Sequence, residues 1–208
     1  MKAQSRGLYL ASSSPRRQAL LQQLGVDFQL LTIDVDESTC LGEKPESYVE
    51  RMALKKARAG KNNLSLAGCV VMGADTSVVI DGKILGKPVD KAHALQMLGL
   101  LSDRTHEVIT SVALVGDDEA CLRTSKTRVT FRRLAKAECE AYWGTGEPQD
   151  KAGAYGIQGK GAIFVESITG SYSGVVGLPL METAELLKHF KLPFWPDHSV
   201  NVLVSKDE

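Results

Sequence analysis

The chain of 208 residues is long enough for one well-packed domain and short for two. Its 25 basic and 25 acidic side chains cancel, whereas proteins that bind nucleic acid polymers usually carry a basic surplus or stripe, so we expect no such polymer as partner. Neither a signal-like N-terminus nor an apolar run of membrane-spanning length is visible, which favours a cytosolic protein without membrane contact.

The first half of the chain alternates short apolar strands with helices that begin at proline. Ser14 is the predicted N-cap of the first helix and Pro15 its first residue, and Gly25 ends it. In chain order we expect a strand at Leu8–Ala11, a helix from Pro15 to Gly25, a helix at Pro45–Gly60, a valine-rich strand at Cys69–Ile80 and a return strand after the turn at Asp81-Gly82.

The second half continues with a mixture of helices and strands. The expected elements are a helix at Asp90–Leu101, a hairpin of Thr105–Val115 and Cys121–Phe131, a helix at Ala135–Trp143, a glycine-rich loop at Gly144–Gly161, a strand at Ile163–Ser167 and a helix at Pro179–Phe190. This pattern predicts an α/β or α+β layered fold with a mixed sheet. We expect residues 1–196 to form a single domain and residues 197–208 a mobile tail.

Two arginines open the first predicted helix. A helix N-terminus offers unpaired N–H groups and the positive end of the helix dipole, so Arg16 and Arg17 are mildly unfavourable there unless an anion binds between them and the helix. Arg17 also shares a helix face with Leu20, Leu21 and Leu24 and should lean toward the interior or a cleft. Taken without other motifs, two solvated surface charges are the more common explanation of such a pair.

The second helix places a lysine on its apolar face. Val49, Met52, Ala53 and Lys56 form one stripe, whereas Lys55 falls outside it. An ammonium group is costly to bury unless it meets an anion, so Lys56 either contacts one or extends its ammonium to water.

Carboxylates occur at two further unexpected places. Aspartate is depleted in strand interiors, yet Asp75 interrupts the valine-rich strand, and Gly73 on the same face would leave room for a ligand. Glu37 lies just beyond a predicted strand, where a solvated turn is the simple explanation. Together Glu37 and Asp75 would suffice for a magnesium ion on a phosphate substrate, since phosphate oxygens and waters complete its octahedron.

Other candidate motifs are weaker. Lys87 precedes Pro88 after the return strand, and the loop containing Gln158 lacks the order of residues of a Walker A or dinucleotide-binding motif. The four cysteines and four histidines are dispersed along the chain, so the sequence predicts neither a disulfide framework nor a zinc cluster.

Six motifs occur in one order from about residue 8 to residue 190: Leu10-Ala11-Ser12-Ser13-Ser14-Pro15-Arg16-Arg17, Ala53-Leu54-Lys55-Lys56-Ala57, Gly73-Ala74-Asp75-Thr76, Leu85-Gly86-Lys87-Pro88, Ser102-Asp103-Arg104-Thr105-His106-Glu107-Val108, and the loop from Glu147 to Gly159. Together they resemble the Maf family of nucleotide pyrophosphatases, whose fold is related to that of inosine triphosphate pyrophosphatases. The resemblance implies a mixed twisted sheet with flanking helices and a central cleft.

The resemblance also implies roles for individual residues. Asp75 matches the family's catalytic aspartate, which accepts a proton and helps to hold the metal, and Glu37 matches its acidic partner. The positions that match residues around the phosphates are Ser12, Arg17, Lys56 and Lys87, and those associated with the choice of base are Arg16, Thr76 and Gln158. Ideal strand alternation puts Asp75 and Thr76 on opposite faces, so we expect a bulge or strand end there, or a contact through the Thr76 backbone.

The threonine after the aspartate and the glutamine of the loop resemble the branch that acts on dTTP and UTP. The resemblance implies hydrolysis of dTTP and UTP, and of modified pyrimidine nucleotides, to the monophosphate and pyrophosphate with Mg²⁺ or Mn²⁺. It also implies a homodimer. Two alternatives stay open: a pyrophosphatase for another nucleotide such as 7-methyl-GTP, and a nucleotide-binding regulator of cell division or septum formation.

Overall fold

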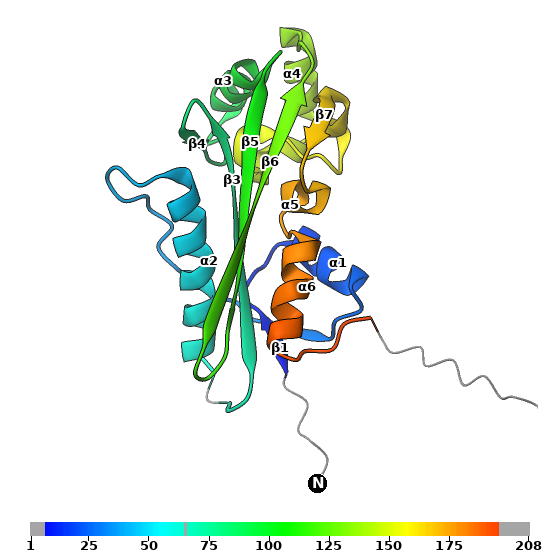
Figure 1. The fold of residues 1–208 in the computed structure, drawn as a ribbon. Helices are drawn as coiled ribbons and strands as arrows, with labels where there is room; N and C mark the ends of the chain where they lie inside the picture. Colours follow the sequence, from blue (N-terminus) through cyan, green and yellow to red (C-terminus); the bar gives the residue numbers. More distant parts are fainter. Residues whose placement is uncertain (1–6, 65, 196–208) are drawn as a thin grey trace, which may run out of the picture.

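The computed structural model describes residues 7–64 and 66–195 (Figure 1). Its strands are β1 (Leu8–Leu10), β2 (Phe28–Leu30), β3 (Val70–Ile80), β4 (Lys83–Leu85), β5 (Thr105–Val115), β6 (Ala120–Phe131) and β7 (Val165–Thr169). Its α-helices are α1 (Pro15–Gln23), α2 (Pro45–Asn62), α3 (Lys91–Leu101), α4 (Lys136–Gly144), α5 (Tyr172–Val176) and α6 (Leu180–His189). Three short 3-10 turns lie at Glu147–Asp150, Ala152–Ala154 and Lys160–Phe164.

Most elements stand where their end signals predict them. Prolines begin α1 and α2, and the side chain of Asp90 accepts a hydrogen bond from the His93 N–H at the start of α3. The last predicted strand lies two residues further on than expected, and α5 and the 3-10 turns of the glycine-rich loop were not expected at all. The tail predicted for residues 197–208 lies outside the described residues.

Within the described residues the strands form one seven-stranded sheet. Its order is β2-β1-β3-β5-β6-β7, with β4 also paired to β3. β1 runs parallel to β2 and β3, and the remaining pairs are antiparallel, so the predicted mixed α/β fold is confirmed.

Helices cover both faces of the sheet (Figure 1). α2 lies along one face, where Gly73 allows a very close approach: a Cβ at this position would collide with the carbonyl oxygen of Ala53 and lie 2.5 Å from the Ala57 nitrogen. Helix backbone therefore fills the space above Gly73 that the sequence assigned to a ligand. On the opposite face, α1, α5 and α6 cover the main core, which includes Leu10, Met72 and Leu186.

One edge of β3 has a gap in its strand pairing. β5 pairs with one edge of β3 without interruption from Val71 to Val79, which leaves β1 and β4 to share the other edge. β1 pairs there with residues 70–72 and β4 with residues 78–80, so no described strand reaches residues 73–77 on that side. Because the Met72 carbonyl accepts a hydrogen bond from the Ala11 N–H of the β1 side, the backbone groups of Ala74 and Thr76 also point into the gap.

Within residues 7–64 and 66–195, no helix is both long enough and apolar enough to cross a bilayer.

Candidate active site

A cavity of about 1100 Å³ opens at the gap in the sheet. This volume is sufficient for a nucleotide-sized ligand. Every residue that the sequence predicted for the site lines it: Ser12, Arg16, Arg17, Glu37, Lys56, Asp75, Thr76, Lys87 and Gln158. The gap explains why segments far apart in the chain meet here, because it lets the cavity reach side chains from both faces of the sheet.

A lysine held between two carboxylates forms the acidic side of the cavity. The Lys56 Nζ lies 2.7 Å from Glu37 Oε1 and 2.7 Å from Asp75 Oδ1. The side chains of Lys56 and Asp75 are only 12% and 11% exposed, whereas that of Glu37 is 55% exposed. Lys56 therefore contacts anions directly and does not extend its ammonium group into water.

Burial and nearby charges act differently on the two carboxylates. Burial raises the pKa of Asp75 above its usual value, and the positive charges of Lys56 and Arg17 offset this only in part. Burial would also raise the pKa of Glu37, but the hydrogen bond and charge of Lys56, with the charges of Lys87 and Arg17, bring the pKa below its usual value. Glu37 is therefore suited to stay ionised, while Asp75 is the carboxylate with greater affinity for a proton.

Arg17 joins three elements around the cavity. Its Nε donates to the Gly177 carbonyl at 2.8 Å, and its terminal nitrogens donate to Ser12 Oγ and Thr76 Oγ1, each at 3.2 Å. Burial lowers the pKa of Arg17, and the charge of Asp75 opposes that shift. The predicted inward orientation of Arg17 is confirmed, and its planar guanidinium ties the serine-rich turn, β3 and the end of α5 together.

The relation between Asp75 and Thr76 corrects one expectation. β3 pairs with β5 residue by residue through this region, so neither a bulge nor a strand end occurs. The two side chains point to opposite faces, and both line the cavity because the gap beside β3 joins the two faces. The Thr76 hydroxyl itself contacts Arg17. Thr110 Oγ1 lies 3.0 Å from Thr76 Oγ1 and 2.8 Å from the Gly174 carbonyl oxygen.

The start of α1 faces the same cavity. Ser14 occupies the predicted N-cap position, but its side chain makes no capping hydrogen bond, and Ser12 Oγ instead accepts from the Ser14 N–H at 3.3 Å. Uncapped N–H groups at a helix N-terminus favour an anion. Arg16 Nη1 lies 3.4 Å from Asp150 Oδ2, and both residues line the cavity.

The glycine-rich loop is ordered by one glutamate. Glu147 accepts hydrogen bonds from the Tyr142 hydroxyl and from the backbone N–H groups of Lys160 and Gly161, at 2.7, 2.8 and 3.1 Å. This arrangement forms the cavity wall that carries Gln158, whose side chain is exposed.

Sequence reasoning missed two residues that support the site. Tyr48 lines the cavity, and its hydroxyl donates to the Glu37 carbonyl at 2.9 Å, which holds the loop that carries this acid. Its position two helical turns before Lys56 was an available signal. Thr110 gave no such signal, because its neighbours come from β3 and α5 and are distant in the sequence.

Comparison with known proteins identifies the family. The family model described as "Maf-like protein" matches residues 7–190. The chain belongs to the Maf family. Among its curated relatives, a protein named dTTP/UTP pyrophosphatase from Alkalilimnicola ehrlichii is 53% identical over 191 residues, which cover 90% of this chain and 94% of the relative. Proteins of the same name from Aromatoleum aromaticum and Saccharophagus degradans are 51% and 49% identical, over 93% and 92% of this chain and 100% and 92% of their own lengths.

The Maf family assignment thus covers all the elements around the cavity. The matched residues extend from β1 to the residue after α6. The lysine between two carboxylates, the uncapped start of α1 and the Arg17 contacts all lie within that span.

Proposed function

We propose that this Maf-family chain is a metal-dependent nucleoside triphosphate pyrophosphatase that hydrolyses dTTP and UTP between the α and β phosphates. Water and the triphosphate would yield the nucleoside monophosphate and pyrophosphate. The observation that carries the proposal is the acidic pair of Glu37 and Asp75, bridged by Lys56 in a cavity that also holds Arg17 and Lys87. Relatives at about half identity with the name dTTP/UTP pyrophosphatase support the choice of substrate.

The donor set of the acidic pair suits a hard divalent cation. Glu37 and Asp75 approach each other closely enough for one ammonium group to contact both, so they already share a cation. Magnesium typically takes one or two protein carboxylates and leaves its other positions to phosphates and water. Mg²⁺ or Mn²⁺ held by these two acids would supply positive charge and Lewis acidity next to the phosphates.

The chain's own residues then have separate tasks. Asp75, whose pKa is raised by burial, accepts the proton of the attacking water. Lys56, Arg17, Lys87 and the N-terminus of α1 offset the negative charge that develops on the phosphate oxygens. Ser12 keeps the Arg17 guanidinium in place through its 3.2 Å hydrogen bond.

Selection of the base is assigned to Arg16, Thr76 and Gln158, as the family resemblance implies. All three line the cavity, and Thr76 is also hydrogen-bonded to Arg17. A contact of Thr76 with the base would therefore couple base recognition to an arginine on the phosphate side. The proposal includes a cytoplasmic location and a homodimer, both of which stay predictions.

The first test measures pyrophosphate release from dTTP, UTP, CTP, GTP, 7-methyl-GTP and ITP with Mg²⁺ or Mn²⁺. We expect preference for dTTP and UTP, and loss of about 10²-fold or more in kcat for Asp75→Asn with nucleotide binding largely retained. Near-normal kcat in that variant would refute the role of Asp75.

The alternatives give different results in the same experiment. Preference for 7-methyl-GTP or another nucleotide would overturn the assigned substrate and leave the chemistry intact. Nucleotide binding without release of pyrophosphate from any substrate would instead favour a regulator of division or septum formation. Among the contacts of the described residues, none favours such a role over catalysis.

A further inference from the structure

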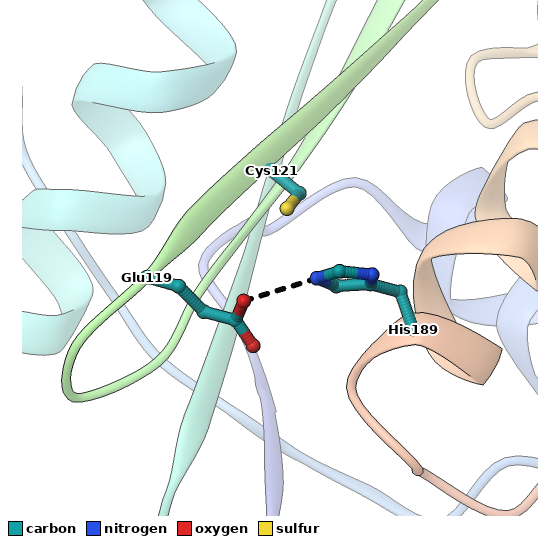
Figure 2. Close-up of side chains that lie close together, drawn as sticks. All are labelled: Glu119, Cys121 and His189. Carbon is teal, nitrogen blue, oxygen red and sulfur yellow. Dashed lines mark hydrogen bonds and ion pairs between the residues drawn. The ribbon is translucent and has the colours of Figure 1, made fainter.

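Three potential metal ligands meet on the surface at the end of the β5–β6 hairpin. Figure 2 shows Glu119, Cys121 and His189 directed toward one another; Glu119 comes from the turn between β5 and β6, Cys121 from the start of β6 and His189 from the end of α6. Their ligand atoms all lie within 4.8 Å of one another. The sequence did not predict this cluster, because Cys121 and His189 are 68 positions apart in the chain.

We propose that Glu119, Cys121 and His189 form a surface site for Zn²⁺, separate from the active-site cavity. None of the three residues lines that cavity. A thiolate, an imidazole and a carboxylate are a ligand set that favours zinc over magnesium, which prefers oxygen ligands alone. The open fourth position is left for water or another small ligand.

The observed distances are close to what such a site needs. Glu119 Oε2 lies 3.0 Å from His189 Nε2. With Zn–N and Zn–O bonds of about 2.0–2.1 Å and a Zn–S bond of about 2.3 Å, tetrahedral geometry requires neighbouring ligand atoms about 3.3–3.7 Å apart. The oxygen and nitrogen must separate by a few tenths of an ångström and the sulfur must approach by at most about 1.3 Å, which side-chain rotation supplies.

The backbone that carries the three ligands is held firmly. Glu119 stands one residue before β6 and Cys121 is the second residue of that strand, and both side chains point toward His189 of α6 (Figure 2). The hairpin turn is closed by a hydrogen bond from the Gly116 N–H to the Glu119 carbonyl at 2.9 Å. His189 is followed by the buried Phe190, whose ring packs on that turn so closely that a Cβ at Gly116 would lie 3.2 Å from it.

A simple surface ion pair does not account for all of the cluster. His189 and Glu119 alone would form an ordinary pair, with side chains 52% and 49% exposed, and such pairs contribute little to stability. The thiol of Cys121 adds a third ligand atom that the pair does not need. The exposure of the pair also gives a metal ion from solution direct access.

The test uses Co²⁺ as a spectroscopic substitute for Zn²⁺ on the reduced, chelator-treated full-length protein. Cobalt bound to a thiolate gives a near-ultraviolet charge-transfer band, whereas cobalt bound only to the active-site carboxylates does not, so the two sites are distinguished. We expect a band that saturates at one Co²⁺ per chain and disappears when Zn²⁺ is added.

Variants locate the thiolate. Cys121→Ser should abolish the band, and Cys40→Ser, which removes an exposed cysteine elsewhere, should leave it unchanged. His189→Gln and Glu119→Gln should each weaken cobalt affinity at least about tenfold, since loss of residues that only support a metal ligand already costs about 10–100-fold. Equal thermal midpoints of the metal-free variants and the parent would show that the fold is intact.

Two results would overturn the proposal. One is the absence of a charge-transfer band in the parent protein at saturating cobalt. The other is a band that persists in Cys121→Ser, because the thiolate would then belong to another cysteine.

Discussion

Replacement of Lys56 by methionine tests the acidic pair most directly. The change keeps the length of the side chain and removes the ammonium group that lies 2.7 Å from both Glu37 and Asp75. Removal of one partner from a buried ion pair typically costs about 3–5 kcal/mol. Because Glu37 is 55% exposed and Asp75 is able to take up a proton, we expect a smaller loss, about 2–3 kcal/mol, in the metal-free protein at pH 7.

Thermal unfolding measures the size of this loss of stability and its dependence on pH and Mg²⁺. For a chain of this length, about 2–3 kcal/mol corresponds to a fall of roughly 5–10 °C in the thermal midpoint. The fall should shrink at lower pH, where Asp75 becomes protonated, and in millimolar Mg²⁺, which restores positive charge between the carboxylates. We also expect kcat to fall by about 10²-fold or more, since a group that offsets phosphate charge is lost.

The matched control is Lys55→Met on the same helix. Lys55 is 39% exposed and bonds to the Asp36 carbonyl at 2.7 Å, outside the acidic pair. Its substitution should change the midpoint little and show no dependence on Mg²⁺. If Lys56→Met lowered the midpoint no more than this control, or by the same amount with and without Mg²⁺, the account of Lys56 as the shared cation of Glu37 and Asp75 would be refuted.

Three further substitutions test other features. Gly73→Ala should cost about 1–3 kcal/mol in urea unfolding and lower kcat, because α2 must move away from β3 and carry Lys56 with it; unchanged stability would contradict the close packing. Burial lowers the pKa of His106 to about 4, so between pH 6.5 and 4 the unfolded chain binds a proton that the folded chain does not. The free energy of unfolding should therefore fall by up to about 3 kcal/mol over this range, and His106→Gln should make it less dependent on pH. Arg17→Lys keeps the charge but not the three directed hydrogen bonds, so KM should rise about tenfold in steady-state assays, and an unchanged KM would remove Arg17 from substrate positioning.

Local signals predicted most of the fold. Pro15 and Pro45 mark the starts of two helices, Asp90 caps a third, and a valine-rich run defines β3, because each signal depends on residues a few positions away. The order of strands could not be obtained this way, since it depends on pairing between distant segments. Helix α5 has only five residues, too few for a periodic pattern to indicate it.

The candidate site was predicted unevenly. The unusual positions of Lys56 and Asp75 are visible in the sequence because each breaks the pattern of its own element. The assignment of Ser12, Lys87 and Gln158 needed the family resemblance, since serines, lysines and glutamines are ordinary in surface loops. Gly73 was misinterpreted because only the fold shows that helix α2, rather than a ligand, occupies the space above it.

The hydrogen-bonding groups of the backbone that face the gap in the sheet do not depend on the side chains of these residues. Ala74 and Thr76 present the same carbonyl groups whichever amino acids stand there, and the same N–H groups unless proline is introduced. A ligand along this edge would meet a row of donors and acceptors that mutation scarcely changes. Residues at the rim, such as Arg16 and Gln158, can vary separately, so ligand preference can evolve without disturbance of the central strand.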